Sequence, residues 1–246
     1  MSKQQFSTVS KHVKRFSRLV TLDPGIYCAI FGSSFDMAMT MWRCQESFDS
    51  PYYEECQGHP NLVDFMEWYA KNHGEMEFSY PDDFHGFNIN NIALTKTYGD
   101  RSKVKDWNRY DDLMCSIWET AKANEHGDEF FIIGVLDNDA ETLEHELAHC
   151  YFGMDEDYAD KQTELVRSNK KLSVKMYNTL VGMGYSGSVA CDETQAYLST
   201  GLTEKMKKFV KEKHRKPFIK VFQDRLKGTE AEKMVKSWRK GGKNED

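Results

Sequence analysis

The sequence predicts an α+β fold, and two features of its pattern support this class. Strand-like and helix-like segments alternate in the first half, whereas nearly everything after Ala140 has the periodicity of helices. The 246 residues are enough for one substantial core. We therefore expect a single domain over residues 1–246, with an N-terminal arm at residues 1–22 and a basic helical extension at residues 203–246.

The first half is expected to form a small sheet with helices. In the arm, Lys11, Lys14 and Arg18 interleave with apolar residues, which favours an N-terminal helix that covers part of the core. The alternative is a targeting or surface-binding arm. Further elements follow in the sequence: strands at GIYCAIF (25–31) and EMEFSY (75–80), and helices at SFDMAMTMWR (34–43) and NLVDFMEWYAKN (61–72), with Asn61 as its N-cap.

The middle of the chain leads from a loop into a buried strand. Residues 81–93 are rich in turn-forming and aromatic side chains, which predicts a loop over the surface or along a cleft. A helix is expected at residues 110–123, and FFIIGVL at residues 130–136 has the length and β-branched content of a buried strand. In the helical part that follows, breaks are expected at Gly153, at Gly182 to Gly187 and at Pro217.

Bulk properties narrow the class of protein. No run of residues approaches the roughly 20 consecutive apolar positions that a membrane-spanning helix needs. The N-terminus also lacks the apolar core of a secretory signal. We therefore expect no membrane span and a cytoplasmic protein. Six cysteines are scattered without a CxxC pair, which predicts free thiols and leaves any metal to histidine and carboxylate ligands.

Charge is distributed unevenly along the chain. Between Thr203 and Lys243 there are 15 Lys/Arg and 5 Asp/Glu, a balance of +10. Because the net charge of the whole chain is −6, the remaining residues carry −16. Apolar residues recur among these lysines at roughly helical spacing. We interpret the segment as packed helices with solvated faces, and do not expect nucleic acid as a partner. The oligomeric state is not predicted.

The motif with the clearest chemistry lies in NDAETLEHELAHCYFGM, where His145, Glu146 and His149 match the HExxH pattern of zinc peptidases. Residues four apart on a helix differ by about 40° of rotation and about 6 Å of rise, so both imidazoles can bind one ion. Glu146 lies about 100° around the helix, where its carboxylate can act on a water molecule as a general base without being a ligand.

The rest of this predicted helix agrees with that orientation. Asp139 is a good N-cap candidate, and Glu141 in the first turn complements the helix dipole. The residues on the side opposite the histidines are apolar and are expected to face the core: Leu143, Leu147, Cys150 and Met154.

A catalytic zinc normally has a third protein ligand. The metzincin pattern places Gly three and His six residues after the second histidine, but here those positions are Phe152 and Asp155, so Asp155 is a weaker candidate. Glu193 lies 44 residues after His149, in a predicted helix that follows a Gly-rich loop. A helical excursion over about residues 158–183 would return the chain to the metal. We therefore favour Glu193.

HELAH, preceded by the aliphatic FFIIGVL and followed by the acidic DETQAYL, resembles the gluzincin branch of the zincin metallopeptidases over about residues 130–200. SFDSPYYE, FMEWYA and FSYPDDFHGFN also resemble segments of uncharacterised metallopeptidase-like proteins of microbes and large viruses. The resemblance implies a zincin-like fold in which His145, His149 and Glu193 bind Zn²⁺. It further implies that Glu146 is the base and then the proton donor, and that FFIIGVL is the edge strand beside the substrate.

One position departs from the thermolysin-like pattern. Those enzymes carry an Asp four residues after the ligand Glu, where it orients a zinc-bound histidine, whereas this chain has Tyr197 there. A phenol can hydrogen-bond to an imidazole, but its electrostatic effect is smaller. The resemblance therefore does not fix how a substrate aligns.

The expected function is zinc-dependent hydrolysis of peptide bonds in a peptide or protein substrate. A zinc-activated water attacks the scissile carbonyl, and Glu146 accepts the water proton. Tyr185, on the GMGYSGS loop, is the first candidate to stabilise the oxyanion, with His85 and Tyr151 behind it. The alternative is a zincin-derived module with a structural metal site that binds protein or nucleic acid; Glu146 argues against it, because such a module needs no base.

Overall fold

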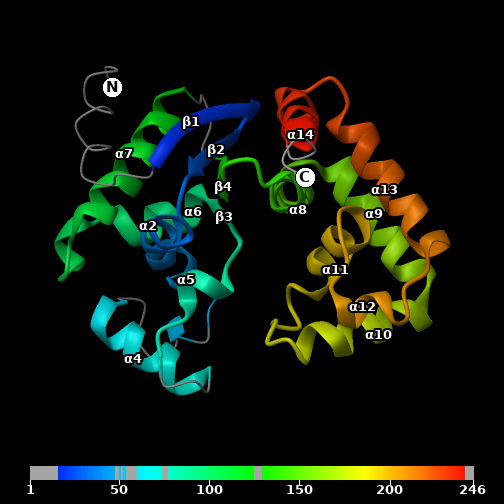
Figure 1. Ribbon diagram of the computed structural model, residues 1–246, viewed down its shortest axis with the longest axis horizontal. Helices are drawn as coiled ribbons and strands as arrows, with labels where there is room; N and C mark the ends of the chain where they lie inside the picture. Colours follow the sequence, from blue (N-terminus) through cyan, green and yellow to red (C-terminus); the bar gives the residue numbers. More distant parts are fainter. Residues whose placement is uncertain are drawn as a thin grey trace. The chain divides into compact units, whose positions relative to one another are not determined.

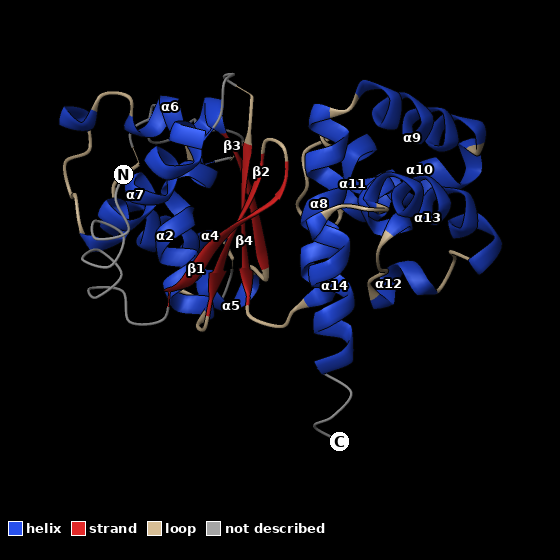
Figure 2. Cartoon of the chain, turned by 90° about the horizontal axis from the view of Figure 1, so that it is seen from above, coloured by secondary structure: helices blue, strands red, loops and turns tan. Residues whose placement is uncertain are grey.

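The computed structural model describes residues 16–47, 50, 52–53, 60–73, 77–124 and 129–241. The chain divides into two compact units, residues 1–137 and residues 138–246 (Figure 1). The first unit contains the sheet, and the elements described in the second are all helices, which confirms the predicted α+β class (Figure 2). The prediction of a single domain stays a prediction.

Unit 1 is built on a four-stranded sheet with the order β1-β2-β4-β3. β1 and β3 pair antiparallel with their neighbours, whereas β2 and β4 run parallel. All six residues of β2 are buried, as its unbroken apolar sequence predicts for an inner strand. The strands have these bounds: β1 Phe16–Asp23, β2 Ile26–Phe31, β3 Gly86–Asn90 and β4 Phe131–Leu136.

The helices of unit 1 gather on one face of this sheet, where α2 and α6 contact its strands (Figure 2). α2 approaches β4 closely at Gly134, where a Cβ atom would lie only 2.8 Å from Met41 Cε. Asn61 caps α4 by accepting hydrogen bonds from Val63 N and Asp64 N, as predicted. The helices have these bounds: α2 Ser34–Glu46, α4 Leu62–Asn72, α5 Tyr80–Asp83, α6 Asn91–Tyr98, the 3₁₀ helix η1 Arg101–Lys103, and α7 Arg109–Asn124.

Three secondary-structure predictions for unit 1 are wrong in the described residues. The arm forms β1 from Phe16 to Asp23 instead of a helix, because Pro24 and Gly25 turn the chain so that it pairs with β2. Gly25 has φ 72°, which a glycine adopts without strain. The remainder of the predicted arm, residues 1–15, lies outside the described residues.

The other two errors concern the segment between α4 and α6. Residues 77–79 form no strand, and Tyr80 begins α5, where Pro81 fits the first turn of a helix. The predicted loop at residues 81–93 instead contains β3, in which buried Phe87 and Ile89 alternate with partly exposed neighbours. The turn-forming asparagines concealed this alternation.

The strand predicted at FFIIGVL is confirmed as β4, but its expected position at the edge is wrong. β4 pairs with β2 on one side and β3 on the other, so neither of its sides is open for a substrate to add as a strand. Its buried, β-branched sequence fits an inner strand better than an edge.

Unit 2 consists of helices packed around the central helix α11, which contacts α8, α9, α10 and α13. The predicted breaks near Gly153 and at Gly182 to Gly187 are confirmed by the ends of α8 and α10. The helices have these bounds: α8 Ala140–Met154, α9 Glu156–Ser168, α10 Lys170–Val181, α11 Ala190–Ser199, α12 Glu204–Lys207, α13 Glu212–Leu226 and α14 Glu230–Gly241.

The predicted break at Pro217 is wrong, because α13 runs through it. A proline inside a helix removes one backbone hydrogen bond and destabilises that turn. The buried side chains of Phe218, Phe222 and Leu226, spaced four residues apart, hold the helix against the unit 2 core directly after that turn. Tertiary packing therefore outweighs the local signal.

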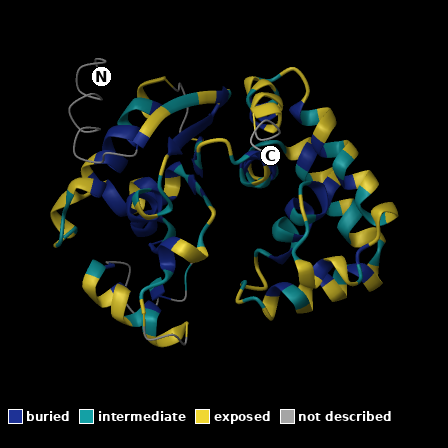
Figure 3. Ribbon diagram, in the orientation of Figure 1, coloured by how far each residue is buried: buried dark blue, intermediate teal, exposed yellow. Residues whose placement is uncertain are grey.

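The basic C-terminal region consists of packed helices with exposed charged faces, as predicted. α14 buries Ala231, Val235 and Trp238 along one stripe, and its lysines lie on the exposed side (Figure 3). None of the described cysteines forms a disulfide, and four of the five are buried, which confirms the expected thiols for these positions. Cys56 lies outside the described residues. Within the described ranges, no helix is both long and apolar enough to cross a membrane.

Candidate metal centre

α8 carries the HExxH motif and is fixed at its start by the predicted cap. Asp139 accepts hydrogen bonds from the backbone N of Thr142 at 3.0 Å and from its hydroxyl at 2.7 Å. Leu143, Leu147 and Cys150 are completely buried, so the apolar stripe faces the core of unit 2 as predicted. Met154, the fourth residue of that stripe, is only partly buried. This anchoring turns the histidine face of α8 toward α11.

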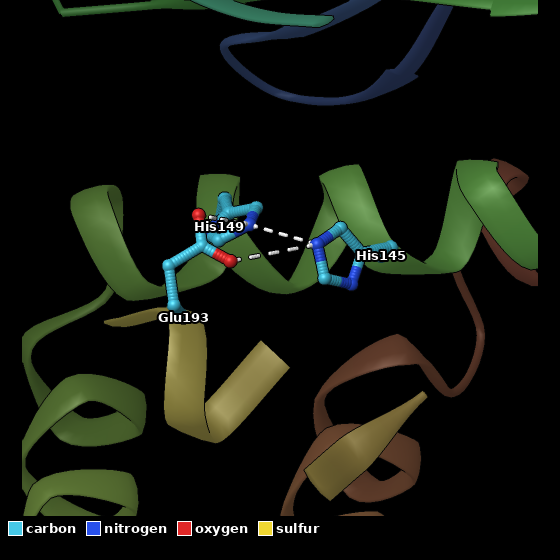
Figure 4. A group of neighbouring side chains, drawn as sticks. All are labelled: His145, His149 and Glu193. Atoms are coloured by element: carbon cyan, nitrogen blue, oxygen red, sulfur yellow. Dashed lines mark hydrogen bonds and ion pairs between the residues drawn. The ribbon is translucent and has the colours of Figure 1, made fainter. Parts of the chain in front are cut away.

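The structure brings the three predicted ligands together. His145 and His149 lie one turn apart on α8, and Glu193 reaches them from the first turn of α11 (Figure 4). The Nε2 atoms of the two imidazoles are 3.2 Å apart. Glu193 places Oε1 3.6 Å from His149 Nε2 and Oε2 3.9 Å from His145 Nε2. Among the described residues, this is the group of His, Cys and acidic side chains arranged to hold an ion.

These separations fit a metal ion. Ligands at about 2.0–2.1 Å from a tetrahedral zinc lie roughly 3.3 Å from one another, close to the 3.2 to 3.9 Å found here. Two imidazole nitrogens and one carboxylate oxygen are also a donor set that suits zinc. Glu193 Oε2 is buried and makes no hydrogen bond within the described part of the chain, an arrangement that a bound cation would satisfy.

Burial and crowding change the pKa values of this group. Burial and the neighbouring His149 lower the pKa of His145 to about 3. Burial also acts to lower the pKa of His149, but the carboxylates of Asp192 and Glu193 outweigh it and raise that pKa to about 10. Burial raises the pKa of Glu193 to about 7. The cluster thus gathers ionisable groups that are strongly coupled at short range.

Glu146, the predicted base, is buried beside the cluster, with 8% of its surface exposed. Burial raises its pKa to about 7; the charge of His149 opposes this rise, and the charges of Glu193 and Asp192 add to it. Glu146 directly follows the ligand His145 on α8, and its charge is coupled to those of His149 and Glu193. Such a buried, proton-accepting group is what a general base near neutral pH requires.

Each histidine has an outer partner that sequence reasoning missed. Asp192 Oδ1 lies 2.9 Å from His149 Nδ1, and Thr200 Oγ1 lies 3.4 Å from His145 Nδ1. A partner at Nδ1 leaves the Nε2 lone pair to face an ion. Asp192 precedes Glu193 in the sequence, and this adjacent acid was the available signal. Thr200 lies seven residues after Glu193, two turns along the same helical face.

Tyr185 and Tyr197 form a pair at the centre. Their hydroxyl oxygens are 3.0 Å apart, so one phenol donates to the other. The ring of Tyr197 lies 4.8 Å from the ring of His145, but its hydroxyl bonds to Tyr185 and not to that imidazole. Burial and the charge of Glu193 raise the pKa values of both phenols, which keeps them protonated and able to donate a hydrogen bond.

The weaker candidates have other roles or other locations. Asp155 ends α8, caps α9 through the backbone N of Tyr158 at 3.0 Å and pairs with Arg225. Tyr151 is completely buried and packs against core rings, with the Arg225 guanidinium 4.2 Å from its ring centroid. His85 belongs to unit 1. The structure thus assembles His145, His149 and Glu193 with Tyr185 nearby, and leaves Asp155 outside the cluster.

Comparisons of the chain with protein-family models, with curated proteins and with solved structures found no match.

Proposed function

We propose that this protein is a zinc-dependent metallopeptidase. The observation that carries the proposal is the meeting of His145, His149 and Glu193, whose ligand atoms lie within 4.8 Å of one another, beside the buried carboxylate of Glu146. A structural metal site needs only the ligands. The additional buried acid, one residue from a ligand, favours hydrolytic chemistry over a purely structural role.

In the proposed reaction, His145, His149 and Glu193 hold the ion. Zinc in such a site supplies a Lewis acid that acidifies water and polarises a carbonyl group. Glu146 accepts a proton from the attacking water and delivers it to the leaving amine nitrogen. Tyr185, paired with Tyr197, donates a hydrogen bond to the carbonyl oxygen as negative charge develops on it.

Elemental analysis of the purified protein tests the metal. We expect about one zinc per wild-type chain and loss of that zinc in His149→Ala and in Glu193→Ala, because three protein ligands are needed. Glu164→Ala, which removes an exposed carboxylate from α9, is the control and should retain it. Iron in place of zinc would contradict the proposal, since two histidines and a carboxylate also hold iron(II) in oxygenases.

A second measurement separates catalysis from metal binding. Glu146→Gln should retain zinc but lose at least about 100-fold in turnover of a diverse peptide library read by mass spectrometry, because general-base catalysis is removed. Glu141→Gln, an exposed acid on the same helix, is the matched control and should hydrolyse normally. Turnover by Glu146→Gln at the wild-type rate, or no hydrolysis by zinc-loaded wild type, would reject the proposed activity.

A further inference from the structure

Asp192, whose carboxylate faces His149, is itself held by a hydrogen bond from the interior of unit 2. Asp192 Oδ1, which lies 2.9 Å from His149 Nδ1, also accepts a hydrogen bond from Gln195 Nε2 at 2.9 Å. Asp192 is about one-third exposed, so solvent alone leaves its rotamer unrestrained. Gln195, by contrast, is completely buried. The hydrogen bond that restrains Asp192 therefore comes from a buried side chain.

All polar groups of the Gln195 side chain have partners, and together they determine its orientation. Nε2 donates to the backbone O of Ala148 at 3.1 Å as well as to Asp192. Oε1 accepts from the Tyr158 hydroxyl at 2.9 Å. An amide turned by 180° would place an oxygen against two acceptors, so only the observed orientation satisfies every group.

We infer that Gln195 is a positioning residue of the metal centre, which holds Asp192, and through it His149, in the geometry for binding a cation. Gln195 ties together three elements: its own helix α11, the backbone of the ligand helix α8 at Ala148, and α9 at Tyr158. The inference rests on the proposed metal site and adds a buried residue that no ligand pattern contains.

The two ligand histidines are consequently held in different ways. Asp192 Oδ1 faces His149 Nδ1 in an ion-pair contact of 2.9 Å, and its negative charge favours a proton on Nδ1, which leaves the Nε2 lone pair to face the ion. The partner of His145 is the neutral hydroxyl of Thr200, which donates its own proton to the backbone O of Ala196 at 2.8 Å. Disturbing Gln195 should therefore affect the His149 side of the site.

Two substitutions test this series of contacts from Gln195 through Asp192 to His149. Gln195→Glu keeps the shape but replaces the donor with an oxygen that faces Asp192 and the carbonyl of Ala148. Competition with a chromophoric chelator should show zinc affinity about 10- to 100-fold lower than in wild type, the range found when outer partners of ligands are removed. Tyr158→Phe leaves the amide free to turn and should lower the affinity less. The visible spectrum of the cobalt-substituted protein should change in both variants.

A matched control separates positioning from loss of stability. Gln162 is the other completely buried glutamine of unit 2, and its Nε2 donates to Ser199 Oγ at 3.2 Å and to the backbone O of Phe218 at 3.4 Å. Gln162→Glu should lower the unfolding temperature yet retain zinc affinity and the cobalt spectrum.

Equal loss of affinity in Gln162→Glu and Gln195→Glu would overturn the inference, as would wild-type affinity and spectrum in Tyr158→Phe and Gln195→Glu together. If Gln195→Glu does not fold, Tyr158→Phe alone decides. Absence of zinc from wild-type protein would instead reject the proposed function, so the two failures are distinct.

Discussion

Buried acids in the two units have different partners. Glu193 Oε2 has no hydrogen-bond partner within the described residues, and its carboxylate faces two imidazoles. Glu46, at the end of α2, is more deeply buried and is satisfied by hydroxyls: Tyr80 donates to Oε1 at 2.9 Å, and Ser50 donates to Oε2. The first arrangement suits a cation, whereas in the second two hydroxyl donors satisfy a buried carboxyl group.

Glu46 allows a prediction about pH. Burial raises its pKa in the folded protein, although the hydrogen bonds from Ser50 and Tyr80 oppose the rise. The folded state thus binds the proton more tightly than the unfolded state does, so the free energy of unfolding falls as pH rises from the unfolded pKa, about 4.3, through the folded pKa. Glu46→Gln keeps an acceptor and has no charge to bury. We expect it to be more stable than wild type at pH 7 and about equal at pH 4.

Urea denaturation at the two pH values measures this difference. Glu67→Gln, an exposed position on α4, serves as the control and should change stability little at either pH. A Glu46→Gln variant that is less stable than wild type at pH 7 would show that the ionised carboxylate stabilises unit 1 instead.

At the scale of elements, α8 and α9 meet at one residue, Asp155. Asp155 ends α8, caps α9 and pairs with Arg225 of α13, its Oδ2 lying 2.7 Å from Nε. These contacts of Asp155 set the direction in which the chain leaves the ligand helix. They also explain why an acid stands where a metzincin would place its third ligand: this carboxylate serves a helix end.

Asp155→Ala is expected to lower the free energy of unfolding by about 1–2 kcal/mol, because it loses a cap and a partly exposed ion pair. Asp155→Asn should lose less, since asparagine also caps helices well. Chemical denaturation measures both, and elemental analysis should find zinc unchanged in each. Loss of zinc from either variant would mean that Asp155 is a ligand after all.

Helices were more predictable from this sequence than strands, for a physical reason. α2, α4 and α8 carry their apolar periodicity and caps within one segment. β1 and β3 depend on pairing with β2 and β4, which no local pattern encodes. The helix predicted for the arm and the loop predicted at residues 81–93 failed for this reason.

In the candidate site, too, local patterns predicted some residues and missed those whose roles depend on tertiary contacts. HExxH fixes the phase of His145 and His149 because both lie on one helix, and Glu193 followed from its spacing and acidic helix. Asp192, Gln195 and Thr200 acquire their roles only from the way α11 crosses α8 and α9. A crossing between helices distant in sequence is a tertiary property, so these partners were beyond a reading of residue spacing.

At the scale of the whole molecule, the basic C-terminal region is tied to the ligand helix by ion pairs. Arg239 of α14 pairs with the buried Glu144 of α8, and Arg225 of α13 pairs with Asp155 at its end. Several lysines pair within their own helices, such as Lys220 with Asp224 and Lys236 with Glu232. Part of the positive charge therefore stabilises unit 2 itself. The expectation that nucleic acid is not a partner stays a prediction.

The location of the three ligands in unit 2 predicts a selective response to metal. A ligand that binds only the folded state stabilises it by about 2.7 kcal/mol at 100 times its Kd. With zinc at that excess, amide hydrogen exchange should slow in α8 and α11 and stay unchanged in the strands of unit 1. A chelator should reverse the effect. Equal slowing in both units would contradict a site confined to residues 138–246.

The buried cysteines described above make the chain its own reporter of partial unfolding. Cys28, Cys44 and Cys115 lie in unit 1 and Cys150 in unit 2, and all four are enclosed in the folded protein. Burial raises the pKa of Cys115 to about 12 and that of Cys28 higher still, so their thiols alkylate only after they open to solvent. Peptide mapping after timed alkylation would consequently give a separate opening rate for each half of the protein, without any engineered residue.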